Sequence, residues 1–527
     1  MAKPKKKQVT TSEEKETTSP STTTKSSSST NQYTKSIFSD SPVYELLHYF
    51  EKAPDQWAAR YILILTAIIL RTAIGLGGHS GYATPPMFGD FEAQRHWMEI
   101  TINLPLSQWY YFDLEYWGLD YPPLTAYHSY IIGLIGGFIN GDWFALDSSR
   151  GIETDELRFF MRFMAIVSEL IIYIPAVLSI ANMLGKKFNV NRMDQIIISL
   201  VIINQAHLVL IDHGHFQFNS VMLGLFVYSV IDLAKGNLIL ASIWFVSCIN
   251  FKQMGLYYSL FIFFYILSQL NSFSHLISVG ITVVATQIVY LLPFIIHKPE
   301  SILQIVHRVF PLGRGLFEDK VANFWCTTNT IIKYRDIIDP QDLPKLALLA
   351  TLVATVPINI LLFFKLRKKP DNIRIPGMIY GFAINSLSFY LFSFQVHEKS
   401  ILVPLIPISL LLLIDHNDIN MIQWVNNVGT FSLYPLLKKD DLIMQYFVSN
   451  LLINWLIGPK ILLKSKFPLN NIAMWSTYAM MIIYHLLDSM MDPPVRYPDL
   501  WVILNITISF IGFAYFWLWL VYKVYKL

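Results

Sequence analysis

The sequence predicts an all-α polytopic membrane protein, and two features of its composition support that prediction. Hydrophobic residues make up 54% of the 527 positions and charged residues 15%, whereas soluble domains average about 25% charged residues. The mean hydropathy is +0.43, and long apolar runs recur along the chain. Length alone would suggest roughly three or four soluble domains, but a bundle of spanning helices forms one continuous body.

Charge and cysteine content give no support to other protein classes. The net charge is +3 and the two cysteines are Cys248 and Cys326, so disulfides do not hold the fold together. The sequence shows no internal repeat, Walker loop, dinucleotide-binding glycine pattern or zinc-ligand spacing. We therefore expect neither a separate nucleotide-binding domain nor a nucleic-acid partner.

Residues 1–40 are predicted to form a disordered cytosolic tail, and residues 41–527 a single transmembrane domain. Lys, Ser, Thr and Glu dominate the tail, which cannot bury enough apolar surface to offset its chain entropy. The first apolar run lies too far from the N-terminus, and is too long, for a cleaved signal peptide. We interpret it as a signal anchor.

Apolar runs long enough to cross a bilayer set the expected number of helices. A spanning helix needs ~20 mostly apolar residues, which predicts about fourteen spans, several of them short. They lie near 58–77, 158–184, 193–211, 216–234, 237–250, 253–270, 276–296, 342–364, 375–394, 400–414, 417–437, 442–463, 471–488 and 500–522.

Basic residues test this topology, since cytoplasmic loops are rich in Lys and Arg. With the basic N-terminus inside, the helix count also places the basic groups at 186–192, 365–369, 464–466 and 523–526 inside. Lys438 and Lys439 are the exception. Both termini are thus predicted to be cytosolic. The same count places the polar stretches 78–157, 212–215, 297–341 and 397–399 together on the luminal side.

The first luminal loop, 78–157, is predicted to be more than a linker. Loops longer than ~12–15 residues without structure are usually functional. Residues 92–101 and 124–139 have helical periodicity but are too short to cross a bilayer, so we expect interfacial helices lying on the membrane surface.

Asp90 is the first candidate for chemistry. It follows Pro85, Pro86 and Gly89 at the expected start of a helix, where free backbone N–H groups favour an ionised carboxylate. An ionised carboxylate in a partly dry cleft is a good general base. A helix cap without further function is the alternative, and Glu92 is the alternative base.

Two further sets of residues suit a sugar and a phosphate. Asp120 can bind sugar hydroxyls while Trp117 offers an aromatic face, although Asp120 can equally cap the following helix. Arg and Lys at a membrane boundary suit a lipid-linked phosphate. The candidates are Arg308, Arg314, Lys320, His397 and Lys399, with snorkelling or pairing to Glu318, Asp319 or Glu398 as the alternative.

Asp212, His213 and His215 have the residue types of a metal site, but two histidines at i and i+2 do not share a helical face. Lys252, near the end of a span, is interpreted as an ion-paired or snorkelling side chain. Two functional classes remain at this point. An enzyme using a lipid-phosphate donor is favoured over a transporter, because transporters often show repeat symmetry and none is visible.

Five segments closely resemble motifs of the endoplasmic-reticulum dolichyl-phosphate-glucose α-1,3-glucosyltransferases. They are 89–101 (GDFEAQRHWMEIT), 117–128 (WGLDYPPLTAYH), 211–219 (IDHGHFQFN), 317–326 (FEDKVANFWC) and 394–399 (FQVHEK). The first run is similar to that of members that add the first α-1,3-glucose to the nine-mannose dolichyl-diphosphate oligosaccharide. Members that add the second glucose are the alternative.

The resemblance implies a GT-C fold in the endoplasmic-reticulum membrane, with the site facing the lumen. It implies an inverting transfer of glucose from dolichyl β-D-glucosyl phosphate to a terminal mannose, with Asp90 as general base and no divalent metal or other cofactor. His397 is the expected ligand of the donor phosphate, with Arg314 and Lys399 as weaker candidates. Glu92, Trp117, Asp120, His213 and His215 are then expected to be acceptor-binding or structural residues.

Overall fold

The computed structural model describes residues 36–51, 57–311, 315–317, 319–462, 465 and 467–527. Residues 1–35 of the predicted tail therefore lie outside the described part, as do Arg314, Glu318, Lys464 and Lys466. The last residues assigned to that tail are described and packed: the backbone N–H of Ile37 donates to Asp194 at 2.9 Å, and the Ser36 hydroxyl bonds the same carboxylate.

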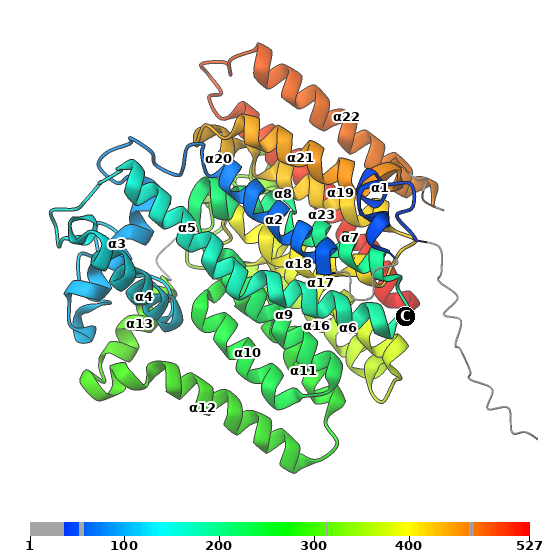
Figure 1. The fold of residues 1–527 in the computed structure, drawn as a ribbon, viewed down its shortest axis with the longest axis horizontal. Helices are drawn as coiled ribbons and strands as arrows, with labels where there is room; N and C mark the ends of the chain where they lie inside the picture. Colours follow the sequence, from blue (N-terminus) through cyan, green and yellow to red (C-terminus); the bar gives the residue numbers. More distant parts are fainter. Residues whose placement is uncertain (1–35, 52–56, 312–314, 318, 463–464, 466) are drawn as a thin grey trace, which may run out of the picture. The chain divides into compact units, whose positions relative to one another are not determined.

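Every regular element in the described part of the chain is a helix, which confirms the all-α prediction (Figure 1). The first half comprises α1 (Pro42–Leu47), α2 (Trp57–Ile74), α3 (Gly89–Asn103), α4 (Pro123–Ile139), α5 (Asp155–Ile171), α6 (Tyr173–Lys187), α7 (Arg192–Ile203), α8 (Ala206–Val209), α9 (Asn219–Lys235), α10 (Leu238–Phe251), α11 (Ser259–Gln269), α12 (Phe273–His297) and α13 (Ser301–Val309).

The second half comprises α14 (Phe324–Thr328), α15 (Tyr334–Ile337), α16 (Leu343–Leu366), α17 (Asp371–Phe392), α18 (Leu402–Leu410), α19 (Ile419–Ser432), α20 (Tyr434–Lys439), α21 (Ile443–Ile457), α22 (Pro468–Met490) and α23 (Leu500–Lys526). Two short elements also matter for the site. They are the π-helical segment η4 (Leu210–Phe216) and the 3₁₀ turn η6 (Glu398–Ile401).

Among the described residues, five helices are long and apolar enough to cross a membrane: the joined α5–α6 unit, α12, α16, α17 and α23. A sixth results if α7 and the segment Ala206–Phe216, which are bent by 40°, count as one broken span. The protein is therefore a multi-pass membrane protein. The predicted number of about fourteen spans is not confirmed.

Helix breaks explain much of that difference. The apolar runs predicted as spans at 237–250, 253–270 and 400–414 contain helices of only 14, 11 and 9 residues, namely α10, α11 and α18. Hydropathy finds the run but not the turn that interrupts it. The run 193–211 is likewise divided, because α7 ends at Ile203 and the chain bends before η4. Such π-helical segments are frequent at functional sites.

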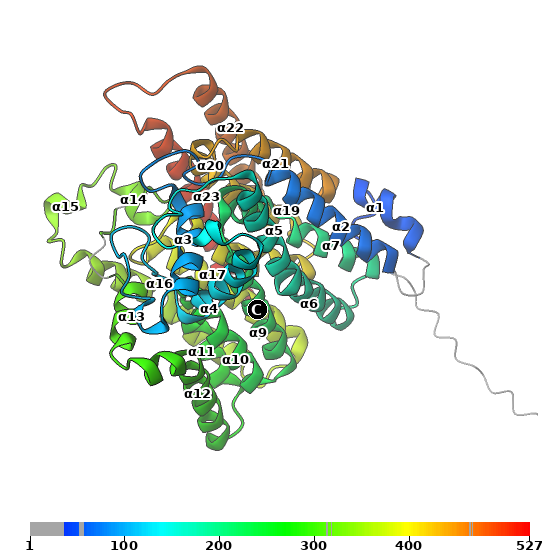
Figure 2. The same cartoon turned by 60° about the vertical axis from the view of Figure 1, so that its left-hand side comes forward.

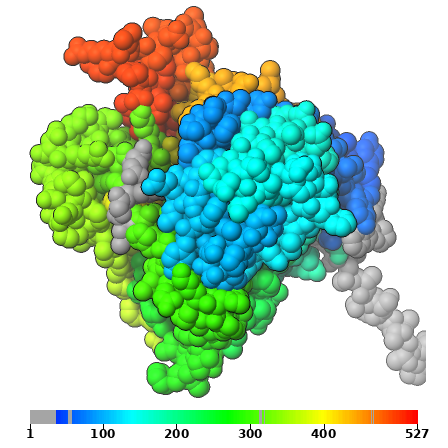
Figure 3. All heavy atoms as spheres, turned by 90° about the vertical axis from the view of Figure 1, so that its left-hand side faces the viewer, coloured from blue at the N-terminus to red at the C-terminus, as the bar shows by residue number. Residues whose placement is uncertain are grey.

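The two helices predicted in the first long loop are present as α3 and α4. They lie side by side in both ribbon views (Figures 1 and 2) and pack against each other. On the face shown in Figure 3, the first loop (blue to cyan) and the segment around α14 and α15 (light green) are both at the surface. This arrangement brings the first residues of α3 to the edge of the helical body.

A buried ion pair connects the helices beneath that edge. Arg71 of α2 donates to both carboxylate oxygens of Glu169 in α5, each at 2.6 Å. His213 of η4 lies 2.6 Å from the same carboxylate. Charged groups in such an environment must be paired, and this cluster fixes η4 against α2 and α5.

Candidate functional site

The start of α3 is shaped by two glycines that let the chain pass close to itself. Gly81 and Gly89 both have positive φ, +74° and +64°. A Cβ on Gly89 would lie 2.6 Å from the carbonyl group of Ser80. The hydroxyl of Ser80 accepts the backbone N–H of Asp90 at 3.2 Å. Backbone contact between these segments thus places Asp90 in the first turn of α3.

The carboxylate of Asp90 is the meeting point of three distant segments. Its Oδ2 accepts hydrogen bonds from Gln217 Nε2 and Lys399 Nζ, both at 2.5 Å. His215 Nε2 lies 3.0 Å from the same oxygen. The Asp90 side chain is 23% exposed. In the described residues these bonds run across the fold and none caps α3, so the interpretation as a simple helix cap is wrong.

The charges around Asp90 keep it ionised. Burial alone would raise the pKa of this carboxyl, but the Lys399 ammonium and the contact with His215 outweigh burial and hold the pKa well below its usual range. The pKa of Lys399 is raised in turn, because the Asp90 charge outweighs the effect of burial. The two groups therefore form an ion pair at neutral pH.

Lys252 orients Gln217. Its ammonium donates to Gln217 Oε1 at 2.9 Å and to Asn219 Oδ1 at 2.6 Å, and it lies 4.7 Å from the ring centroid of Tyr121. With the amide oxygen of Gln217 bound to Lys252, the amide NH₂ must face Asp90. Lys252 is 3% exposed, so the interpretation as an ion-paired or snorkelling side chain is wrong.

Burial, and then the charge of Lys399, lower the pKa of Lys252 to about 7. The charge of Asp120 opposes this shift. Asp120 therefore lies within electrostatic reach of Lys252.

Asp440 supports the site from the opposite side of His215. His215 Nδ1 lies 2.5 Å from Asp440 Oδ2, and Asp440 is the C-cap residue that follows α20. Asp440 also lines a cleft of about 710 Å³, together with Trp117, Lys439 and Asp441. Trp117 is held at this cleft by a 2.5 Å hydrogen bond from its indole N–H to the Met87 carbonyl.

Of the expected phosphate ligands, Lys399 alone among the described residues contacts Asp90. His397 lies two residues away, and its Nδ1 contacts Asp319. The His397 side chain is 41% exposed. Arg308 donates to the carbonyls of Gly118 and Leu119, which makes it a structural brace for the 117–128 segment. Lys320 pairs with Asp499, and Arg314 lies outside the described residues.

Glu92 and His213 bind groups other than Asp90. Glu92 is buried and receives two hydrogen bonds from Arg95, at 2.6 and 2.7 Å, which gives it a structural place within the first loop. His213 contacts Glu169, as described above. Glu92 is therefore poorly placed as an alternative base.

The metal-site alternative is not supported by the geometry. Asp212 accepts the backbone N–H groups of Asn219 and Ser220, at 3.2 and 2.7 Å, and so caps α9. His213 and His215 point to different partners. No group of three or more His, Cys, Asp or Glu side chains suited to a metal ion occurs in the part of the chain that the structure describes.

Sequence reasoning missed Gln217, Lys252 and Asp440 as parts of the site. Gln217 lies in the 211–219 run, two residues after His215, and could have been included with it. Asp440 follows Lys438 and Lys439, the one basic pair that the helix count placed on the luminal side against the charge rule. That exception marked a polar segment that the same count placed on the side of Asp90.

Comparison with known proteins gives consistent matches over nearly the whole chain. The "Dolichyl pyrophosphate Man9GlcNAc2 alpha-1,3-glucosyltransferase" of Saccharomyces cerevisiae is 45% identical over 94% of this chain and 96% of its own. The "probable" enzyme of that name from Schizosaccharomyces pombe is 44% identical over 91% and 94%, respectively. The Gallus gallus protein is 38% identical over 88% and 96%.

Among solved structures, ArnT from Cupriavidus metallidurans bound to undecaprenyl phosphate is similar with a TM-score of 0.41 and 11% identity, covering 87% of this chain and 77% of its own. The family profile of the ALG6, ALG8 glycosyltransferases matches residues 64–520. Since that match spans most of the sequence, the chain belongs to the ALG6, ALG8 glycosyltransferase family.

Proposed function

We propose that the protein transfers glucose from dolichyl β-D-glucosyl phosphate to the terminal mannose of the dolichyl-diphosphate-linked nine-mannose oligosaccharide. The product linkage is α-1,3, and the reaction takes place on the luminal side of the endoplasmic-reticulum membrane, in a GT-C fold. The observation that supports this proposal most strongly is the 45% identity to the yeast Man9GlcNAc2 α-1,3-glucosyltransferase over 94% of the chain. The ionised Asp90, where segments predicted to be luminal converge, supports it.

Asp90 acts as the general base in this proposal. Every hydrogen bond that the described residues make to its carboxylate ends on Oδ2, so Oδ1 is left for the mannose hydroxyl. That hydroxyl attacks C1 of glucose from the side opposite the phosphate, which inverts the β linkage to α. One carboxylate suffices, because a phosphate leaving group needs no proton, unlike the leaving group in glycoside hydrolysis.

Lys399 and His397 stabilise the departing phosphate. Lys399 carries three N–H donors, of which one faces Asp90 and one lies near His215, so the third can face a phosphate beside the base. His397 is two residues away and 41% exposed. Fixed cations at a site where negative charge develops lower the barrier to transfer. Arg314 stays a candidate for the same role.

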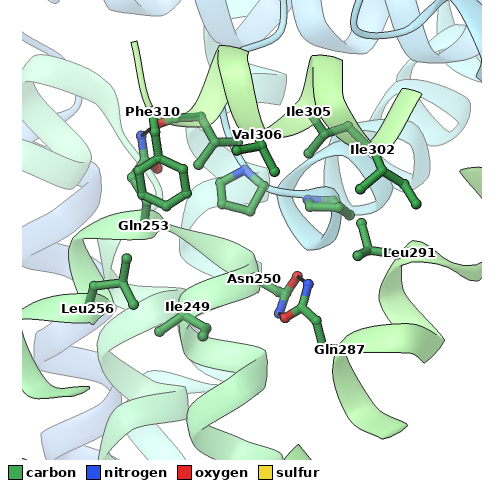
Figure 4. Close-up of a pocket in the computed structure, with 13 residues that line it drawn as sticks. Ile249, Asn250, Gln253, Leu256, Gln287, Leu291, Ile302, Ile305, Val306 and Phe310 are labelled. Carbon is green, nitrogen blue, oxygen red and sulfur yellow. Dashed lines mark hydrogen bonds between the residues drawn. The ribbon is translucent and has the colours of Figure 1, made fainter. Parts of the chain in front are cut away.

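The prenyl chain of the donor fits the apolar surroundings of the site. A pocket of about 250 Å³ opens between α10, α12 and α13 (Figure 4). Its walls include Ile249, Leu291 and Ile305, and it reaches Gln253, the neighbour of Lys252. Asn250 and Gln287 satisfy each other's amides at 2.7 and 3.2 Å, so their polarity is neutralised within the apolar wall.

A transfer assay with defined substrates tests the function. The purified protein in lipid nanodiscs would receive dolichyl phosphoglucose and either the unglucosylated nine-mannose acceptor or the same acceptor carrying one glucose. We expect product from the unglucosylated acceptor alone. Transfer to the monoglucosylated acceptor alone would assign the chain to the second-glucose reaction, and no transfer to either would refute the proposal.

A further inference from the structure

His215 and Asp440 lie next to Asp90 and have no role in the transfer steps proposed above. His215 is 2% exposed and lies between two carboxylates, with Nε2 at 3.0 Å from Asp90 Oδ2 and Nδ1 at 2.5 Å from Asp440 Oδ2. Asp90 belongs to α3, His215 to η4, and Asp440 is the C-cap residue after α20. They form a continuous line of groups within hydrogen-bonding distance of one another.

The position of Lys399 determines which ring nitrogen carries hydrogen. An ammonium group only donates hydrogen bonds, and Lys399 Nζ lies 3.2 Å from His215 Nε2. In the neutral ring with its hydrogen on Nδ1, pointing to Asp440, Nε2 accepts from Lys399, and Nε2 and Asp90 Oδ2 then share this ammonium as two acceptors. A carboxylate at Nδ1 fixes this tautomer and stabilises the imidazolium that forms when Nε2 takes a proton.

The proposed reaction needs such a proton acceptor. The donor is a phosphodiester with one negative charge, whereas released dolichyl phosphate is a monoester that approaches two. Transfer therefore sets one proton free. Asp90 takes it from the mannose hydroxyl. Because Lys399 favours the ionised form of Asp90, this carboxyl group holds the proton only weakly.

Resting on the proposed function, we propose that His215 receives the proton that Asp90 removes, and that Asp440 is the positioning residue that keeps Nε2 free to accept it. The mannose O–H bond breaks as the O–C1 bond forms and the C1–O bond to phosphate breaks. The proton goes to Asp90 and then, after the carboxyl group turns about Cβ–Cγ, to His215 Nε2. When the products leave, the proton returns through Asp90 to water.

Asp440→Asn tests this role with little change of shape. The Asn amide N–H would donate to Nδ1, which forces the ring hydrogen to Nε2 and blocks proton uptake from Asp90. We expect kcat to fall by ~10²–10⁴, the upper figure matching Asp-to-Asn exchange behind the histidine of a catalytic triad. The KM values for donor and acceptor should stay within about twofold of the parent, since neither substrate is placed on Asp440.

Two controls separate this role from a structural one. Asp142→Asn makes the same exchange at an exposed carboxylate outside the cleft and should leave kcat unchanged. Asp440→Glu should restore a large part of kcat, because a carboxylate again faces Nδ1. If Asp440 served only to hold the turn after α20, the longer side chain would be no better than Asn.

A double variant completes the test. Because Asp440 acts through the ring, His215→Gln with Asp440→Asn should be no slower than His215→Gln alone. If the two single-variant losses in kcat multiply in the double variant, the proposal is overturned. An unchanged kcat in Asp440→Asn, or an effect on KM alone, would also overturn it. If the parent protein transfers glucose and Asp440→Asn does so at the same rate, only the proton role is refuted. If the parent protein transfers no glucose, the proposed function itself is refuted.

Discussion

The charge of Asp90 depends on residues far from it in sequence. Lys399 is 309 positions away, and Gln217 is 127 positions away. Asp90 was predicted as a candidate base from the residues next to it, since turn residues and a helix start are local features of the sequence. Gln217, Lys252 and Asp440 were not, because an amide, a lysine and an aspartate acquire their roles only when separate helices bring them together.

Removing the Lys399 charge should change the pH dependence of transfer. Lys399 holds the pKa of Asp90 below its usual range, so Lys399→Gln should raise that pKa and move the acid limb of kcat/KM to higher pH. Loss of one stabilising donor should also lower kcat by roughly 10²–10³. Initial rates between about pH 3 and 8, a range that includes the ordinary pKa of an aspartate, measure both effects. An acid limb at the parent's position would contradict the ion pair described here.

At the scale of elements, the start of α3 is the most constrained part of the site. Asp90 reaches its partners because residues 80–81 and 88–89 pass within backbone contact. The sequence predicted a helix here, and Gly89 suggested a turn. It could not show that the turn is closed by Ser80, because that contact depends on the path of the intervening loop.

Gly89→Ala should therefore disturb the site more than the fold. The added Cβ meets the Ser80 backbone at 2.6 Å, and Gly89 has φ of +64°, a conformation that costs other residues about 1–2 kcal/mol. We expect a loss of transfer greater than about tenfold, since small misplacements of catalytic groups are costly. Gly141→Ala, whose Cβ meets nothing within 4 Å, is the matched control and should behave as the parent. Equal rates for both variants would contradict this account.

At the scale of elements, hydropathy did not predict where the helices break. It located the apolar runs but predicted continuous spans where the chain breaks, as between α7 and η4. Asp212, His213 and His215 lie in the π-helical segment η4 after this break, and their side chains diverge to cap α9, to contact Glu169 and to contact Asp90. Spacing rules for a regular helix argued against a shared metal ligand set, but they did not predict the separate contact partners of these three side chains.

For the whole molecule, the helix count, tested against the distribution of basic residues, was the most useful guide. The count placed the segments that carry Asp90, His215 and Lys399 on one side of the membrane, and these residues meet in the structure. That side is predicted to be luminal. The number of spans could not be obtained in this way, because an error in two short helices leaves the sidedness of the later loops unchanged.

Metal removal tests the chemistry proposed for the whole enzyme. With the charge of the departing phosphate assigned to Lys399 and His397, extensive treatment with EDTA should leave the transfer rate within about twofold of the untreated protein. The assay uses metal-free buffers, with Mg²⁺ or Mn²⁺ restored in parallel samples. A rate that collapses on chelation and returns with the metal would contradict this assignment.

The most direct test of the account is the transfer rate of Asp90→Asn. The amide has nearly the shape of the carboxylate but cannot take a proton from the mannose hydroxyl, so single-turnover transfer from dolichyl phosphoglucose should fall by ~10²–10⁴. Its elution as a monodisperse particle and its thermal midpoint in detergent would show that the fold is intact. A correctly folded Asp90→Asn protein that transfers glucose at the parent rate would contradict the claim that Asp90 is the base.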